Sequence, residues 1–410
     1  MARILFITPM WYEDATPTDA KVCNFFVDEW IKQGHQVVVA HYRSQFPKLY
    51  RIIGKMLPAL RKRICGDNAA MNLDTKETTY SYRGATVFST PIFKYIPHGT
   101  FSQRTLNDHG QRLQSHLASI EFTPDAIIGH FCNPTVEIIE RLRATFPHAK
   151  TAVVFHDSAP TIRRILGEDA QRRLNLIDVL GYRSLDIKRS IEGAYKLSNR
   201  NFICYSGIAS SFLEIEPPSR TWANGPIKNF LFVGRMVQYK HPKAVAEALL
   251  AAYPHKDFSL RYIGNAGTAS KSTEAFVNDN KLNNQISFLG QIERKKIIQW
   301  YDQSDCFVMI SDHEVFGLVY LEAMSRGCIT IAGNNGGMEG IIKSGENGFL
   351  CTPGNVEELA SIIKKINSMS AAEKQKMSDN AIQTAKYFSD KNAAALYLNN
   401  VFSGGGDREE

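Results

Sequence analysis

Residues 312–327 read DHEVFGLVYLEAMSRG and form the most informative part of this chain. A buried strand is expected to end just before them, at Ile310, and a short turn then carries Glu314. Gly317 lets the backbone approach a ligand closely, because glycine has no side chain. A helix is expected at residues 318–326, since Gly327 suits the position that follows a helix.

The start of this helix is expected to bind a phosphate. Its free N–H groups and its dipole face the ends of the strands, where they would attract an anion. Glu322 lies about one turn further on, and its carboxylate can accept two hydrogen bonds from the vicinal hydroxyls of a ribose. The alternative is a surface glutamate followed by an amphipathic helix that holds a second glutamate by chance.

Strands and helices alternate on both sides of this segment, which is typical of parallel sheets covered by helices. In the first half, strands are expected at residues 4–8, 36–40, 126–129 and 151–155, with a helix at 22–33. In the second half, strands are expected at residues 229–234, 260–263, 286–289, 306–310 and 329–332. The sequence therefore predicts an α/β protein with two Rossmann-like halves.

The chain length of 410 residues suits two domains of about 200 residues each. A stretch rich in proline, glycine and polar residues, at 216–228, is expected to link them. We place the domains at residues 1–215 and 229–385, and expect a C-terminal helix at about 386–402 to pack back on the first domain. Residues 403–410 read SGGGDREE and are expected to form a flexible tail.

Glu314 and Glu322 form a pattern that resembles the E-x7-E signature of the retaining GT-B glycosyltransferases, family 4 in particular. Other segments resemble motifs of that family in the same order, namely NG at 224–225, VGRMVQYK at 233–240, ISFLG at 286–290, GGMEGII at 336–342 and GENGFL at 345–350. The resemblance implies two Rossmann-like domains whose parallel sheets face each other across a cleft. The first domain would bind the acceptor and the second the nucleotide-sugar donor.

The resemblance also implies roles for residues of the second domain. Arg235 and Lys240 would neutralise the diphosphate and stabilise the charge that develops on it as the glycosidic bond breaks. Glu314 would lie over the donor sugar, and Glu322 would bind the nucleotide. The remaining donor-binding candidates are Gly234, Gly290, Phe316, Gly317 and Leu318. Because two cations serve the phosphates and no D-x-D signature is present, neither a metal nor another cofactor is expected.

Candidates in the first domain follow its expected strands. His156 matches the family's histidine near the reacting sugar, while a local structural hydrogen bond is the alternative. His130 follows the neighbouring strand, and Asp157 either orients His156 or caps the next helix. The loop after the first strand lacks the glycine pair of many relatives, so we expect its side chains to contact the acceptor. These candidates are Trp11, Tyr12 and Lys21.

Residues 43–64 carry seven basic residues and no acidic one, with apolar residues at helical spacing. Such a segment either lies on an anionic membrane surface or packs its apolar face on the first domain. The formal net charge of +7 favours anionic partners. Nucleic acid is not expected, because no aromatic platform is interleaved with the basic residues.

Seven scattered cysteines and the lack of a long apolar run indicate a cytoplasmic protein, either free or peripheral on the inner face of the membrane. The resemblance predicts transfer of a sugar, from a UDP-sugar first and GDP-mannose second, to a glycan or lipid-linked acceptor. Surface polysaccharide synthesis, including lipopolysaccharide and capsule, is the expected setting. The alternatives are an epimerase or hydrolase of the same fold, and a non-catalytic nucleotide-sugar-binding subunit.

Overall fold

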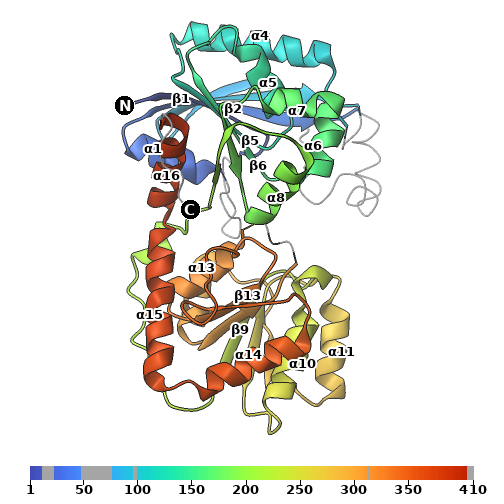
Figure 1. The fold of residues 1–410 in the computed structure, drawn as a ribbon, viewed down its shortest axis with the longest axis vertical. Helices are drawn as coiled ribbons and strands as arrows, with labels where there is room; N and C mark the ends of the chain where they lie inside the picture. Colours follow the sequence, from blue (N-terminus) through green and yellow to red (C-terminus); the bar gives the residue numbers. More distant parts are fainter. Residues whose placement is uncertain (12–22, 48–75, 96–98, 313, 315, 404–410) are drawn as a thin grey trace.

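The computed structural model describes residues 1–11, 23–47, 76–95, 99–312, 314 and 316–403. These residues form two α/β domains, each built around its own sheet, and the domains lie one above the other in Figure 1. Strands and helices alternate in both, as the sequence predicts.

The sheet of the first domain has eight strands, all parallel except β3, which pairs antiparallel with β4. In sheet order the strands are β3 (Thr78–Tyr82), β4 (Ala85–Phe93), β2 (Gln36–Gln45), β1 (Arg3–Thr8), β5 (Ala126–His130), β6 (Lys150–Phe155), β7 (Val179–Tyr182) and β8 (Arg200–Ile203). The central strands are apolar along most of their length, because helices cover both faces of this sheet.

Helices fall on two sides of that sheet and form two separate apolar cores. On one side lie α1 (Asn24–Lys32) and the C-terminal helix α16 (Asp390–Phe402). On the other side lie α4 (Gln103–Ser119), α5 (Thr135–Leu142), α6 (Ala159–Leu166), the 3-10 turn η1 (Gly167–Asp169), α7 (Ala170–Leu174) and α8 (Leu185–Ala194).

The second domain has a six-stranded parallel sheet. In sheet order its strands are β11 (Ile286–Phe288), β10 (Ser259–Ile263), β9 (Asn229–Val233), β12 (Cys306–Met309), β13 (Ile329–Gly333) and β14 (Phe349–Cys351). Its helices are η2 (Gln238–Lys240), α10 (Pro242–Ala252), α11 (Ser270–Asp279), α12 (Arg294–Asp302), α13 (Leu318–Ser325), α14 (Val356–Ser368) and α15 (Ala371–Tyr387).

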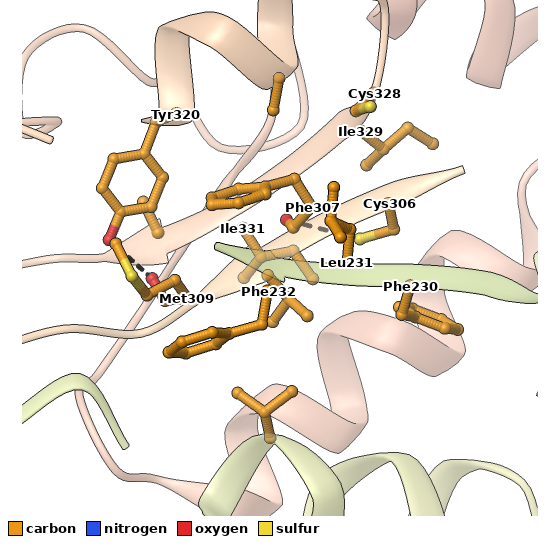
Figure 2. Packing of buried hydrophobic residues seen from close by; sticks show 14 of the residues in the cluster. Phe230, Leu231, Phe232, Cys306, Phe307, Met309, Tyr320, Cys328, Ile329 and Ile331 are labelled. Atoms are coloured by element: carbon orange, nitrogen blue, oxygen red, sulfur yellow. Dashed lines mark hydrogen bonds between the residues drawn. The ribbon is translucent and has the colours of Figure 1, made fainter. Parts of the chain in front are cut away.

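Figure 2 shows the core of the second domain, where side chains of β9, β12 and β13 interleave beneath α13. The hydroxyl of Tyr320, on α13, donates a hydrogen bond of 2.8 Å to the carbonyl oxygen of Met309, at the end of β12. Tyr320 is 1% exposed, so this bond fixes the first turn of α13 on the sheet.

The chain crosses between the domains twice, and the two crossings are hydrogen-bonded to each other. The amide of Ile208 donates to the carbonyl of Phe388 at 2.8 Å, and the amide of Asp390 donates to the carbonyl of Ile208 at 3.1 Å. A Cβ on Gly207 would lie 2.2 Å from the Cα of Asp390, so only glycine allows this approach. Beyond the second crossing, α16 packs on α1 and accepts a 3.0 Å hydrogen bond from the indole of Trp30.

The boundary between the domains differs from the expected one. Ile208 lies just before the short helix α9 (Ser210–Leu213), and Phe212 lies on it. Both belong to the core of the second domain. The segment 216–228 is packed onto the second domain, because Arg220 donates to the carbonyl oxygens of Ser304 and Arg326 at 2.6 and 3.0 Å. Apolar residues ahead of the proline-rich stretch therefore set the boundary.

Candidate functional site

A cavity of about 250 Å³ opens at the carboxyl ends of β9 and β10, beside the first turn of α13. The sheet order places β9 next to β12, where successive connections run to opposite sides. Ligands of open parallel sheets bind outside the strand ends at such a switch point. The wall of the cavity includes Gly234, Arg235, Asn265, Arg294, Leu318 and Glu322.

Glu322 is almost fully buried in this wall, with a side chain that is 4% exposed. Its Oε1 accepts two hydrogen bonds from Arg294, from Nε at 3.0 Å and from Nη2 at 2.5 Å. Its Oε2 accepts a third from the hydroxyl of Tyr301 at 3.1 Å. A charge this buried needs such partners, and α12 supplies both of them.

Lys240 and Glu314 form an ion pair close to the cavity. The Nζ of Lys240 lies 3.0 Å from Oε2 of Glu314, and the two side chains are 13% and 22% exposed. The hydroxyl of Ser311 donates to the same carboxylate oxygen at 3.3 Å. The structure thus brings together two predicted site residues that are far apart in sequence, and it pairs each with the other.

Glycines bring the backbones of two strand ends close together at the floor of the cavity. A Cβ on Gly264 would lie 2.2 Å from the carbonyl oxygen of Gly234, and Gly264 has a φ of +143°. The amide of Gly264 donates to the carbonyl of Gly290 at 2.8 Å, and Gly290 has a φ of +69°. Arg235 directly follows Gly234 in the sequence; it is exposed and lines the cavity wall.

The pair of glycines at 336–337 packs closely against the loop before α13. The amide of Gly337 donates to the carbonyl of Glu314 at 2.6 Å, and a Cβ on Gly337 would lie 2.2 Å from the Cα of Phe316. Gly317 begins α13 with a φ of 76°, and within the described part of the chain no side chain caps this helix. Its first-turn amides therefore remain suited to an anion.

Two histidines meet at the strand ends of the first domain. The Nδ1 of His130, at the end of β5, lies 3.0 Å from Nε2 of His156, which follows β6. Phe131 stacks on the ring of His156, with 3.8 Å between the ring centroids. Burial, and to a lesser degree the charge of Arg183, holds the pKa of both histidines well below its ordinary value. Both rings are therefore neutral near pH 7, so one nitrogen of the pair donates and the other accepts.

His130 is 0% exposed and packed among aromatic rings, so it supports His156 and does not face an acceptor. Of the two roles expected for Asp157, capping the next helix does not match the geometry. Ser158, not Asp157, is the residue that precedes α6, and no side chain of the described residues caps that helix. Burial raises the pKa of Asp157, and the nearby Arg164 opposes that rise.

One candidate in the first loop, Trp11, is placed differently from the expectation. Trp11 is 6% exposed and packs edge-on against Tyr82 at 5.0 Å, so it belongs to the core and not to an acceptor surface. Tyr12 and Lys21 lie outside the described residues. The aromatic character of Trp11 fits both roles, and only the packing separates them.

Arg43 does not belong to an exposed basic segment. It is 8% exposed within β2, and its Nη2 donates to the backbone carbonyls of Lys76 and Ser89. The rest of the expected amphipathic segment, residues 48–64, lies outside the described part of the chain. Among the described residues, no helix is both long and apolar enough to cross a bilayer, and no group of three His, Cys, Asp or Glu side chains is arranged to hold a metal ion.

Two residues of the site escaped the sequence analysis. Arg294 and Tyr301 hold Glu322 from a helix about two dozen residues away, so no local motif contains all three. A weaker signal was present in Arg294 itself, because a cation in the first turn of a helix opposes the helix dipole. In the structure, the contact with Glu322 offsets that cost.

A third unforeseen residue, Arg183, connects the two domains. It follows β7 and is 2% exposed, and it donates to the carbonyl of Cys204 at 2.8 Å. Its guanidinium carbon lies 5.6 Å from the ring centroid of Phe316, in the loop before α13. The exposed pair Arg189 and Glu339 joins the domains again, with two contacts of 2.8 Å.

Residues 221–384 match the sequence profile of the family described as Glycosyl transferases group 1. Over 126 residues the chain is 29% identical to the D-inositol 3-phosphate glycosyltransferase of Paenarthrobacter aurescens (strain TC1), which covers 30% of this chain and 31% of that relative. The chain spans between 16% and 51% of the length of the first three curated relatives that it matches.

Two solved structures resemble the whole chain. Sucrose-phosphate synthase from Thermosynechococcus elongatus has a TM-score of 0.64 and 17% identity, covering 98% of both chains. The lipopolysaccharide outer core galactosyltransferase WaaB has a TM-score of 0.65 and 18% identity, covering 98% of this chain and 99% of its own. At such identities these likenesses show the fold. The protein therefore has the GT-B fold, and residues 221–384 in its second half are similar to the glycosyl transferases group 1 family.

Proposed function

We propose that this protein is a retaining glycosyltransferase that moves a sugar from a nucleotide diphosphate donor to a glycan or lipid-linked acceptor. The observation that carries the proposal is the cavity at the switch point of the second sheet, with Arg235, Arg294 and Glu322 in its wall. Cations and an uncapped helix start suit the diphosphate, and a buried carboxylate suits the ribose. The match to the group 1 family covers this same part of the chain.

The residues around the cavity would divide the donor between them. Arg235 and the main-chain amides near Phe316, Gly317 and Leu318, at the start of α13, would contact the diphosphate. Lys240 would reach it beside Glu314, which already holds the ammonium group 3.0 Å away. Glu322 would bind the ribose. These two cations would take the place that a metal holds in other phosphate chemistry, so we propose that no metal is needed.

The transfer step would proceed on one face of the sugar. The bond between the anomeric carbon and the phosphate oxygen breaks, and its electron pair goes to the phosphate. The acceptor oxygen forms the new bond on the same face and gives its proton to the leaving phosphate. Arg235 and Lys240 would stabilise the growing phosphate charge, as preorganised groups do in a transition state. His156, neutral near pH 7, would hydrogen-bond a sugar hydroxyl.

The donor and the acceptor belong to the same proposal. A UDP-sugar is our first choice of donor and GDP-mannose the second. For the acceptor we propose a surface glycan, lipopolysaccharide or capsule among them. The fold likeness to a lipopolysaccharide outer core galactosyltransferase supports this setting. A cytoplasmic location, peripheral on the inner face of the membrane, completes the proposal.

A thermal-shift panel with UDP, GDP, ADP and CMP tests the donor site, with EDTA present. A ligand at a hundred times its Kd stabilises the fold by about 2.7 kcal/mol, which is roughly 5–11 °C for a domain of this size. We expect one nucleoside diphosphate to raise the Tm of the wild type. Glu322→Gln should lose about half of that shift, because one hydrogen bond is worth roughly tenfold in Kd. Glu247→Gln, on the surface of α10, should keep it.

Product analysis with and without an acceptor then separates the reactions. A transferase releases nucleoside diphosphate much faster when an acceptor is present. A hydrolase releases it without one, an epimerase releases none, and a binding subunit turns nothing over. No shift with any nucleotide would remove the donor site from the proposal.

A further inference from the structure

The carboxylate of Glu322 has little room left for a ribose. A carboxylate offers about four lone-pair positions, two on each oxygen. Arg294 fills both positions on Oε1, with its Nε and Nη2 groups, and the hydroxyl of Tyr301 fills one on Oε2. One acceptor position therefore remains, on Oε2, and a vicinal pair of hydroxyls needs two.

Arg294 itself has donors to spare. A guanidinium carries five N–H donors, and the two bonds to Glu322 use two of them. The side chain is 23% exposed and lines the same cavity as Glu322. Arg294 can therefore donate to the oxygen of a ribose hydroxyl while it still holds the carboxylate.

The second domain's core holds this arrangement in place. Phe212, on α9, is 2% exposed, and its ring centroid lies 5.7 Å from the guanidinium carbon of Arg294 and 6.3 Å from the ring centroid of Tyr301. Both partners of Glu322 thus rest on one buried ring. Their orientation is fixed before any ligand arrives, which lowers the cost of ordering on binding.

We propose that the donor ribose is bound by Glu322 and Arg294 together, with one hydroxyl donating to Glu322 and the other accepting from Arg294. Tyr301 is a positioning residue, which holds the free lone pair of Glu322 toward the cavity. This inference rests on the proposed function and adds a second ribose-binding residue to it. The two hydroxyls are then distinguished by different side chains.

Binding of UDP, 2′-deoxy-UDP and 3′-deoxy-UDP by isothermal titration calorimetry tests the inference, with the GDP series in its place where GDP is the nucleotide that binds. One hydrogen bond corresponds to roughly a tenfold change in Kd. We expect the wild type to lose about tenfold in affinity when either hydroxyl is removed. Arg294→Gln should lose the discrimination at one hydroxyl and keep it at the other. Tyr301→Phe should weaken the discrimination that depends on Glu322.

Two further variants guard against misfolding. Arg294→Gln leaves a buried carboxylate without a cation, so the double variant with Glu322→Gln, which has no such charge, should fold and show no discrimination at either hydroxyl. The matched control is Arg261→Gln. Arg261, on β10, lies over the ring of Trp300, which belongs to α12 like Arg294, but Arg261 does not line the cavity. It should bind all three nucleotides as the wild type does.

The outcomes distinguish this inference from the proposed function. A wild type that binds both deoxy analogues as tightly as the parent nucleotide refutes the ribose assignment and leaves the transferase proposal standing. An Arg294→Gln variant that keeps both discriminations refutes the role of Arg294. A wild type that binds no nucleoside diphosphate overturns the proposed function and this inference with it.

Discussion

Replacing Gly317 by alanine should destabilise the loop before α13, and the structure lets us estimate by how much. Gly317 starts α13 with φ 76° and ψ 65°, which is the left-handed region. A residue with a Cβ costs about 1–2 kcal/mol in that conformation. Contact adds to this, because the new Cβ would lie 2.5 Å from two ring carbons of Tyr320.

The ring of Tyr320 cannot easily turn away. It is 1% exposed, and its hydroxyl donates to the carbonyl of Met309 at 2.8 Å. Overpacking of this kind costs about 1–3 kcal/mol. The two effects give a loss of roughly 3 kcal/mol in the free energy of unfolding, or a Tm lower by roughly 6–12 °C.

Thermal unfolding of three alanine variants separates the two effects. Gly345 has a φ of +89° with nothing within 4 Å of the new Cβ, so Gly345→Ala measures the backbone cost alone. Gly193, within α8, has open space and no such backbone, so Gly193→Ala should stabilise by about 0.5–1 kcal/mol. If Gly317→Ala lowers the Tm no more than Gly345→Ala does, Tyr320 yields freely and our account of this loop is refuted.

Lys240→Met should lower kcat about 10²–10³-fold, which is the range for losing one preorganised group at a developing charge. Steady-state kinetics measures this loss. The control Lys243→Met, which removes a lysine paired with the surface residue Glu247, should have little effect on kcat. His156→Gln should change how stability depends on pH, measured by urea unfolding at pH 5.5 and 7.5. The folded-state pKa of His156 is depressed, so below about pH 6.5 the unfolded state takes up a proton that the folded state does not. The wild type should therefore lose about 1.4 kcal/mol per pH unit relative to the variant as the pH falls below 6.5; parallel curves would contradict the buried, neutral ring.

The second domain was the more predictable half from sequence, and the reason is local. Its strands are apolar runs set between turns, and five of the six were located within one residue at each end, as β12 shows at Cys306–Met309 against the expected 306–310. The missed strand, β14, has only three residues, Phe349–Cys351. It overlaps the end of the segment 345–350, which entered the sequence analysis only as a motif of the resemblance, and so short a run carries no period.

The first domain was harder to predict because its elements are polar or very short. Helix α4 (Gln103–Ser119) places only a few apolar side chains on the core, and the sequence analysis predicted no helix there. Strands β7 and β8 have four residues each. Strand β3 is exposed along most of its length. Tertiary packing decides such segments, whereas local propensity does not.

The site was predicted in its separate parts and not in its pairings. Sequence motifs identify Glu322 and Glu314, since each lies within a short segment of the resemblance. They do not show which residues pair, because Lys240, which a motif does identify, and Arg294, which none does, follow other strands. A motif records which residues a strand end carries. The sheet order determines which of them meet, and that order follows from packing along the whole domain.

The loop before α13 shows what such pairings achieve. The second domain holds this loop through Lys240 and Gly337, which both contact Glu314. Phe316 contacts the other side: its ring centroid lies 6.0 Å from that of Tyr205, in the first crossing between the domains, and 5.6 Å from the guanidinium carbon of Arg183, in the first domain. The neutral histidines of the first domain lie within the field of that same buried guanidinium. The position of the loop therefore depends on both domains at once. A change in their approach would move the ring of Phe316, and with it the backbone that is expected to contact the diphosphate.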